Sequence, residues 1–310
     1  MSRIRLEGLV VGQVDGGTEA PPDATSAREK ENLRRAAATA LENGLAFVDR
    51  HGGDWARLRV RGVLGATPVE ACARTIADTQ NADGSFAVLG LSEGGAPGLT
   101  AVQAAGLDSS GLGTFEALVA LSDLGMHHHA CVEGSAVFMH SIQLEDGSWG
   151  APGLSPDARV FVTGMVAGLL GRTRVVRPEV LDAAGEFLAE RFTPERISGR
   201  NWEALTAFGV FFTNVGHDQA DSALQWIGRE LERGHRMRIY EAGLTVRTLL
   251  HCQTLAVPGA GLDPFLLLAD LLGEQGADGG FAELASGPEL SRVEPTLDGM
   301  LGIIRLCESF

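Results

Sequence analysis

Apolar residues recur at intervals of three and four along almost the whole chain from residue 27 onward. This spacing is typical of amphipathic helices, whose apolar side chains gather on one face. Alternating patterns typical of strands are nearly absent, and the clearest runs from Leu58 to Val63. The pattern therefore predicts an all-α fold over residues 27–310. Residues 1–26 are predicted to be a tail, because Gly12–Ser26 is rich in Gly, Pro and acidic residues.

A turn motif repeats between the helical segments. Three segments share the pattern Gln-x-x-Asp-Gly-(Ser or Gly)-aromatic, namely Gln80–Phe86, Gln143–Trp149 and Gln275–Phe281. Weaker turns are predicted at residues 50–55, 191–194 and 232–235. The six turns lie about 45 residues apart on average, an interval that fits one helical hairpin.

The six turns divide the chain into paired helices. Helices before the turns are predicted at residues 28–50, 67–81, 129–144, 178–192, 218–233 and 262–276. Helices after the turns are predicted at residues 55–65, 108–125, 155–171, 199–215, 237–254 and 292–308. Six hairpins form an open solenoid or close into a ring, and an open solenoid needs polar capping repeats. The last helix is as apolar as the middle ones, which favours an (α/α)6 toroid with an inner and an outer ring.

Charge and composition exclude several classes of partner. The net charge is −15, from 25 Lys and Arg against 40 Asp and Glu. An acidic chain repels nucleic acid and anionic lipid, so we expect neither as a partner. The longest apolar stretches are shorter than the roughly 20 residues that span a bilayer, so no membrane insertion is expected. The four scattered cysteines form no Cys-x-x-Cys pair, which is typical of reduced thiols in a cytoplasmic protein.

The repeated turns resemble the QW repeats of triterpene cyclases and the equivalent turns of protein prenyltransferase β subunits. The resemblance covers about residues 28–310 and implies an (α/α)6 toroid. The acid motif Asp-x-Asp-Asp of class II cyclases is reduced here to Asp108–Gly111 and Asp157–Val160. At the positions of the prenyltransferase zinc ligands the chain has Arg238–Tyr240 and Glu294–Thr296. No cofactor is therefore expected, and Mg²⁺ remains an option only for a diphosphate substrate or for binding by the acids described next.

Four of the helices after the turns carry an acid at one shared register, between an apolar and a small residue: Glu116, Glu203, Glu241 and Asp298. In the helix predicted at residues 155–171, Val162 occupies the position of the acid. We expect the acids to face the central cavity, where burial and mutual repulsion raise their pKa and keep one as a general acid. Alternatively, the acids pair with arginines of the inner helices and hold the ring together: Arg159, Arg238 or Arg247.

Aromatic and thioether side chains are expected to line the cavity around these acids: Phe115, Phe161, Trp202, Phe208, Tyr240 and Met300. Tyr240 is the only tyrosine and adjoins Glu241, so its hydroxyl is a candidate to orient a substrate or donate a proton. The pair His251-Cys252 is interpreted as packed at the end of an inner helix. The Gly-rich segment Ala87–Leu107 is either a lid over the cavity or a surface insertion.

These features support a first hypothesis: a terpenoid-cyclase-like enzyme that binds a small apolar, isoprenoid substrate. One of the four acids would protonate an alkene, epoxide or carbonyl, and aromatic faces would stabilise the resulting cation. The first alternative is a prenyltransferase-like subunit that acts with a helical partner subunit or as a homodimer. Its diphosphate would be received by Arg159, Arg200 or Arg238. The second alternative is a non-catalytic toroid that binds a hydrophobic ligand or a protein.

Overall fold

The computed structural model describes residues 22–88, 105–281 and 292–309, and these contain twelve helices and no strand. The helices before the turns are α1 (Pro22–His51), α3 (Val69–Ala77), α6 (Cys131–Ser141), α8 (Pro178–Ala189), α10 (Ala220–Arg236) and α12 (Pro264–Gly273). Those after the turns are α2 (Asp54–Val63), α5 (Ser109–Asp123), α7 (Pro156–Gly171), α9 (Trp202–Asn214), α11 (Ala242–Cys252) and α13 (Val293–Cys307). The all-α prediction and the twelve predicted helices are confirmed.

Several boundaries differ from the prediction: α3 ends at Ala77 instead of residue 81, and α11 begins at Ala242 instead of residue 237. Helix α1 begins at Pro22, inside the segment predicted as a tail. Helix α10 continues to Arg236, so the turn predicted at residues 232–235 is wrong. A glycine is needed at position 234 of that helix because the Tyr240 ring packs against its backbone. A Cβ there would lie 2.2 Å from Tyr240 Cδ2. Residues 1–21 of the tail and residues 89–104 of the predicted lid lie outside the described ranges.

Helix starts follow local sequence signals. Asp108 caps α5 by accepting a hydrogen bond from the Gly111 amide at 2.7 Å, and Asp263 caps α12 in the same way. Proline occupies the first position of α7, α8 and α12, where its missing N–H costs nothing. These signals explain why the predicted starts of α5, α7, α8 and α12 lie close to the observed ones.

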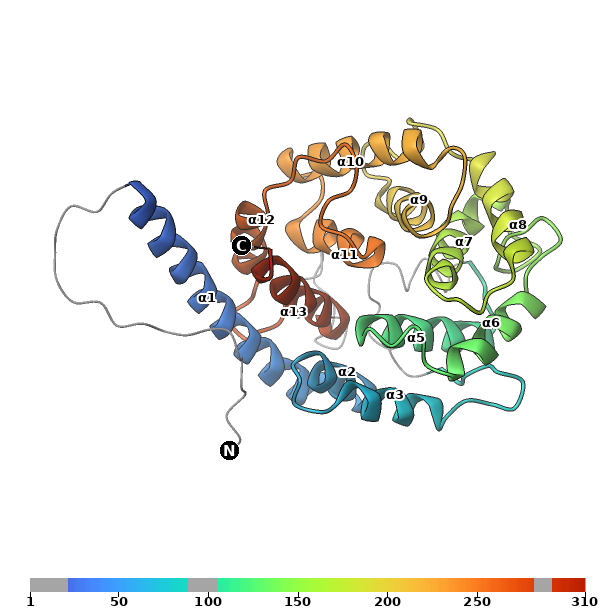
Figure 1. The fold of residues 1–310 in the computed structure, drawn as a ribbon, viewed down its shortest axis with the longest axis horizontal. Helices are drawn as coiled ribbons and strands as arrows, with labels where there is room; N and C mark the ends of the chain where they lie inside the picture. The colour runs from blue at the N-terminus through green and yellow to red at the C-terminus, as the bar shows by residue number, and fades with distance from the viewer. Residues whose placement is uncertain (1–21, 89–104, 282–291, 310) are drawn as a thin grey trace.

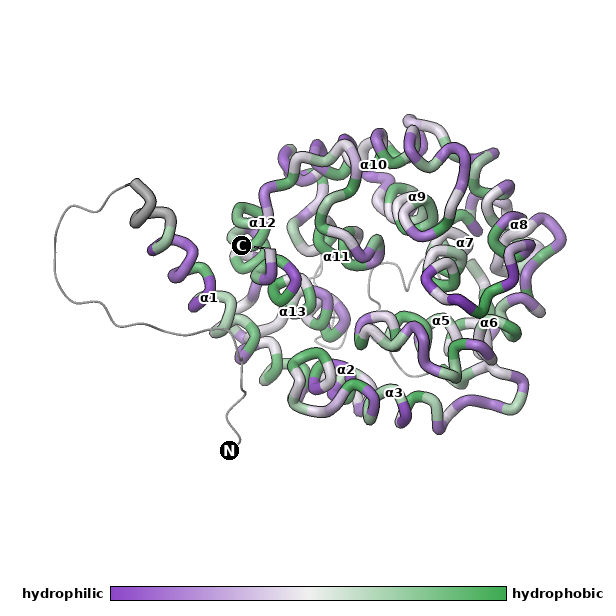
Figure 2. Tube along the Cα trace, viewed as in Figure 1, coloured by the Kyte–Doolittle hydropathy of each residue, from purple (hydrophilic) through white to green (hydrophobic). Residues whose placement is uncertain are grey.

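The helices contact one another in a cyclic order (Figure 1). Each of α2, α5, α7, α9, α11 and α13 contacts the next in this series, and α13 contacts α2. The other six helices pack outside them, and α1 contacts α13 as well as α2. Helices α7 and α9 are mostly hydrophobic or neutral, whereas hydrophilic positions recur along α10 (Figure 2). The chain therefore brings its first and last hairpins side by side.

The glutamines of the three repeated turns join each hairpin to the next outer helix. Each side-chain amide donates to the carbonyl four residues later, at 2.9 Å in all three turns. The same amide donates to the following outer helix: Gln80 to Cys131 in α6, Gln143 to Val180 in α8, and Gln275 to Ala40 in α1. The third bond, 2.8 Å long, links the last turn to the first helix.

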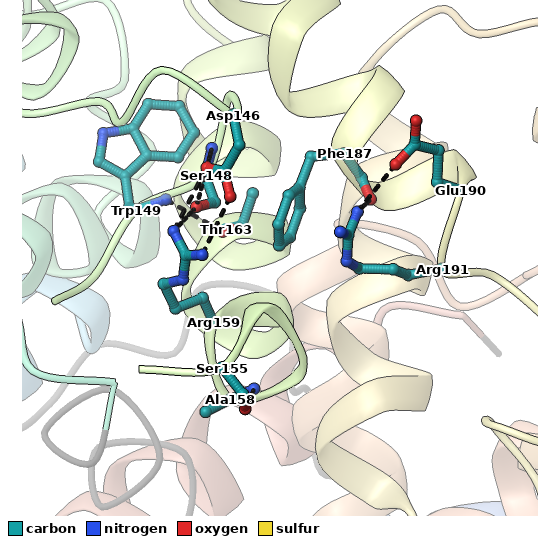
Figure 3. A network of polar contacts seen from close by, with 10 residues as sticks. All are labelled: Asp146, Ser148, Trp149, Ser155, Ala158, Arg159, Thr163, Phe187, Glu190 and Arg191. Atoms are coloured by element: carbon teal, nitrogen blue, oxygen red, sulfur yellow. Dashed lines mark hydrogen bonds and ion pairs between the residues drawn. The ribbon is translucent and has the colours of Figure 1, made fainter. Parts of the chain in front are cut away.

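The rest of each turn binds its own hairpin. The backbone N–H of the aromatic residue donates to the hydroxyl of a threonine in the following inner helix. The pairs are Phe86 with Thr114, Trp149 with Thr163, and Phe281 with Thr296, at 3.0–3.1 Å. Figure 3 shows the middle turn, in which Asp146 also accepts from Ser148 and Arg159. Gly147 has φ +81°, and a Cβ there would lie 2.1 Å from the Ala183 carbonyl oxygen of α8. The Asp-Gly pair is therefore required both for the turn and for the close approach of the next helix.

Glycines also allow close contact between the inner helices α7 and α9. A Cβ at Gly164 would lie 2.5 Å from the carbonyl oxygen of Ala207, and one at Gly168 would lie 2.4 Å from Val210 Cγ1. These glycines, one turn apart, let the two backbones approach.

None of the helices in the described ranges combines the length and apolar character needed to cross a membrane. The four cysteines are free thiols.

Replacement of Gln275 tests the join between the last turn and α1. We expect Gln275→Ala to lower the free energy of unfolding by about 1–3 kcal/mol, because it leaves partly buried carbonyls without a donor. Urea unfolding measures the change, with Gln225→Ala on the exposed side of α10 as the matched control. Equal stability of the two variants would contradict a structural role for Gln275.

Candidate functional site

The four predicted acids divide into two environments. Glu116 of α5 and Asp298 of α13 are buried, with 1% and 8% of their surface exposed. Glu203, the second residue of α9, is exposed, and Glu241 is the partly exposed residue that precedes α11. The shared register therefore does not give the four carboxyls one environment.

Asp298 forms an ion pair between two neighbouring helices, α13 and α11. Its Oδ2 lies 3.0 Å from Nη2 of Arg247, on the neighbouring helix α11. The predicted alternative, that an acid pairs with an inner-helix arginine, is thus observed for Asp298 and Arg247. Burial raises the pKa of Asp298 to about 6; Arg247 opposes this shift, and the nearby carboxylates Glu294 and Asp123 add to it. Asp298 is therefore a carboxyl group that titrates near neutral pH.

Two of the predicted lining aromatics, Phe161 and Trp202, contact neighbouring inner helices, whereas Tyr240 bonds to the turn before α9. The ring centroids of Phe161 and Trp202 lie 6.1 Å apart. The Trp202 indole donates to Thr248 Oγ1 at 3.0 Å, and the Tyr240 hydroxyl donates to the carbonyl oxygen of Gly199 at 2.7 Å. Burial raises the pKa of Tyr240 to about 12.

Other predicted lining residues lie in different contacts. Phe115 is buried in α5. Phe208 is fully buried with its ring 5.2 Å from that of Phe192, which follows α8. Met300 is fully buried and faces α1, since a Cβ at Gly44 would lie 2.8 Å from its Sδ. Phe208 and Met300 thus pack toward the outer layer.

The arginines considered for a diphosphate are engaged elsewhere or exposed. Arg159 pairs with Asp146 in the middle turn, with Nη2 2.9 Å from Oδ2 (Figure 3). Arg238 pairs with Asp270 at 3.0 Å, and Arg200 is exposed. Two of these arginines are thus paired with different aspartates, and the contacts of the three do not define a shared diphosphate site.

Sequence reasoning missed a buried ionic network centred on Arg59 of α2. Arg59 is 2% exposed, and its Nη1 donates to both carboxylate oxygens of Glu294 in α13, at 2.8 and 2.9 Å. Its Nη2 donates to Asp123 at the end of α5. Burial alone would lower the pKa of Arg59, but the attraction of Glu294 and Asp123 outweighs it and raises the pKa. The network thus joins α2, α5 and α13, and through Asp298 and Arg247 it reaches α11.

Within the described residues, no group of three or more His, Cys, Asp or Glu side chains is arranged to hold a metal ion. No protein-family model matches the chain, and no curated protein matches it significantly.

Removal of the central guanidinium tests the network. We expect Arg59→Met to lower the free energy of unfolding by about 3–5 kcal/mol, because the buried Glu294 and the partly buried Asp123 lose their cation. Arg61→Met, on the same helix at an exposed position, is the matched control and is expected to stay within about 0.5 kcal/mol of wild type. A small effect at Arg59 would show that the two carboxylates are solvated in solution.

The raised pKa of Asp298 makes the free energy of unfolding depend on pH, and the direction of this dependence is defined. The folded protein holds the proton more tightly than the unfolded chain, where the pKa is about 4. Protonation therefore favours folding, and this contribution is complete below pH ~4 and lost as the pH rises through about 6. Wild type should lose about 1 kcal/mol relative to Asp298→Asn between about pH 5 and about pH 8. Urea unfolding at both pH values measures this, and a constant difference between the two proteins would contradict the raised pKa.

Proposed function

We propose that the twelve helices form an (α/α)6 toroid and that the protein is a terpenoid-cyclase-like enzyme, with an apolar, isoprenoid substrate bound inside the ring. The cyclic order of helix contacts supports the toroid. The hydrogen bond from Gln275 to Ala40 supports it independently. This bond joins the last hairpin to the first in the way that Gln80 and Gln143 join their hairpins to the next outer helix.

The observation that carries the proposed chemistry is Asp298, a carboxyl with a raised pKa on an inner helix. A general acid works best when its pKa lies near the operating pH. Protonated Asp298 would transfer its proton to an alkene, epoxide or carbonyl of the substrate. Arg247, 3.0 Å away, would stabilise the carboxylate that remains.

The cation formed on the substrate also needs stabilisation. Phe161 and Trp202, on adjacent inner helices, offer aromatic faces of the kind that attract cations. Glu116 is the second candidate donor because it is also buried, whereas Glu203 and Glu241 are more exposed. Tyr240 is not part of the proposed site, because its ring packs on Gly234 of α10 and its hydroxyl is bonded to the backbone.

A non-catalytic toroid that binds a hydrophobic ligand is the second candidate. It is favoured by the fact that Asp298, Trp202 and Tyr240 each have a partner within the protein. A prenyltransferase-like subunit is less favoured, because a diphosphate would have to displace Asp146 from Arg159 or Asp270 from Arg238.

The first experiment is native mass spectrometry of the freshly purified chain for a retained isoprenoid. The protein is then incubated with isoprenoid alkenes, epoxides and polyprenyl diphosphates, with and without Mg²⁺, and products are identified by gas chromatography with mass spectrometry. With the substrate that turns over, we expect Asp298→Asn to reduce kcat by about 10²–10⁴-fold.

Asp221→Asn, at an exposed position of α10, is the matched control. Unchanged turnover in folded Asp298→Asn would contradict its role as proton donor. A retained isoprenoid without turnover of any substrate would favour the non-catalytic candidate. Release of diphosphate only with Mg²⁺ would favour the prenyltransferase-like one.

A further inference from the structure

Two of the three repeated turns bind an arginine near the start of the inner helix that follows. In the middle turn, Arg159 Nη2 lies 2.9 Å from Asp146 Oδ2 (Figure 3). In the last turn, Arg292 Nη1 lies 2.6 Å from Asp278 Oδ2. Each arginine stands four residues before the threonine that accepts from the turn aromatic. The two turns therefore hold a guanidinium group in the same way.

The same guanidinium groups also face a phenylalanine ring of the next outer helix. The guanidinium carbon of Arg159 lies 5.9 Å from the ring centroid of Phe187 in α8. That of Arg292 lies 5.0 Å from the ring centroid of Phe47 in α1. The negative face of an aromatic ring attracts a cation at such distances. An aspartate and a phenylalanine thus interact with each guanidinium.

The first turn has the same phenylalanine. Phe138 of α6 corresponds to Phe187 and Phe47, because each lies seven residues after the carbonyl that accepts from the turn glutamine: Cys131, Val180 and Ala40. The turn glycines repeat this register. A Cβ on each would lie 2.1–2.3 Å from the carbonyl oxygen of the residue four positions before that phenylalanine: Gly134, Ala183 and Asn43.

The first turn differs in the residue at the position of the arginine. Its aromatic, Phe86, donates to Thr114, and the residue four positions before that threonine is Ser110. Ser110 carries no charge and has a short side chain. The first turn therefore has the aspartate, Asp83, and the ring, Phe138, but a serine in place of the arginine.

The charge of Asp83 is not balanced by a cation in the described ranges. Its Oδ1 accepts from the amide and the hydroxyl of Ser85, at 3.0 and 2.7 Å. These hydrogen bonds lower the pKa of Asp83, so the exposed carboxylate is ionised at neutral pH. Residues 89–104, the next along the chain, contain no Lys or Arg. Asp83 therefore has a free carboxylate oxygen, Oδ2, among the described contacts.

We propose that the first turn is a docking site for an arginine side chain of a partner protein. The guanidinium of the partner donates to Oδ2 of Asp83 and lies against the ring of Phe138, as Arg159 and Arg292 do at their own turns. Arginine suits this pair better than lysine, because a planar guanidinium can bond to a carboxylate and stack on a ring at the same time.

The surface near this turn fits such a partner. The net charge of −15 favours a basic partner over an acidic one. Val88, two residues after the turn aromatic, and Val137, next to Phe138, remain 39% and 59% exposed and offer apolar contacts for residues that flank the arginine. The site consists of a turn and an outer helix, so it does not depend on the isoprenoid chemistry proposed above.

The first test is an NMR titration of the full, isotope-labelled chain with N-acetyl-arginine amide. The lysine and citrulline derivatives are titrated in parallel at matched ionic strength, and citrulline is the uncharged analogue of arginine. We expect the arginine derivative to shift the backbone amide signals of Gly84, Ser85 and Phe138. The lysine derivative is expected to bind more weakly, and the citrulline derivative to leave these signals unchanged.

Replacement of the carboxylate tests the role of Asp83. Asp83→Ser keeps a side-chain oxygen that can accept from the Ser85 amide, so the turn is expected to form. We expect it to weaken binding of the arginine derivative by about 3- to 10-fold, as for loss of one exposed charged hydrogen bond. Asp218→Ser, at the exposed position before α10, is the matched control and should bind as wild type does.

The reverse variant supplies the arginine from the chain itself. Ser110→Arg is expected to place a guanidinium between Asp83 and Phe138 and therefore to abolish the shifts caused by the arginine derivative. It is also expected to raise Tm by about 1–2 °C relative to Ser109→Arg, the matched control at the neighbouring exposed position.

Three outcomes overturn the proposal. Equal shifts with arginine and citrulline would show that the charge of Asp83 is not recognised. Equal binding of arginine and lysine would reduce the site to a general attraction for cations. Full binding of the arginine derivative to Ser110→Arg would place its site elsewhere. None of these results bears on turnover of an isoprenoid, so the two proposals fail separately.

Discussion

The cyclic order of helix contacts depends on one constraint: the last hairpin must meet the first, so that α13 contacts both α1 and α2. Here the join is made by a side chain. The Gln275 amide binds the Ala40 carbonyl at a distance equal to that between Gln80 and Cys131. Because each such amide also binds its own turn, a hairpin and its neighbour are held by one planar group. At these joins the same side chain therefore orders the turn and holds the next outer helix.

The contact of α13 with α2 brings together charged groups that are far apart in the sequence. Arg59 and Glu294 are 235 positions apart in the chain, and they meet only because α13 returns to α2. Burial of such a pair adds little net stability, since desolvation offsets most of the attraction. Its effect is on specificity, because an alternative packing of α13 would leave Arg59, Glu294 and Asp123 buried without partners. Apolar packing sets the contact of α7 with α9, and electrostatics selects the position of α13.

The sequence allows local structure to be predicted well, because its signals are local. Caps such as Asp108 and the Asp-Gly turns act within a few residues, and they define the helices to within a few positions. The direction of each inner side chain is not local. Helices that are apolar on all sides do not reveal which face meets the outer layer, so Met300 was expected in the cavity and instead lies against Gly44. Arg59 was available as a signal, since it interrupts the apolar face of a short helix, but its partners lie far away in the chain.

The buried network and the proposed chemistry act on each other through Asp298. When Asp298 is ionised, Arg247 has a partner and the positive field at His251 is partly neutralised. When Asp298 is protonated, Arg247 loses the negative charge that balances it. The interior then holds one more uncompensated guanidinium, which increases its attraction for a negative group. Charge on Glu294 and Asp123 and a proton on Asp298 should therefore favour each other, which couples the proposed proton donor to the Arg59 network through charge alone.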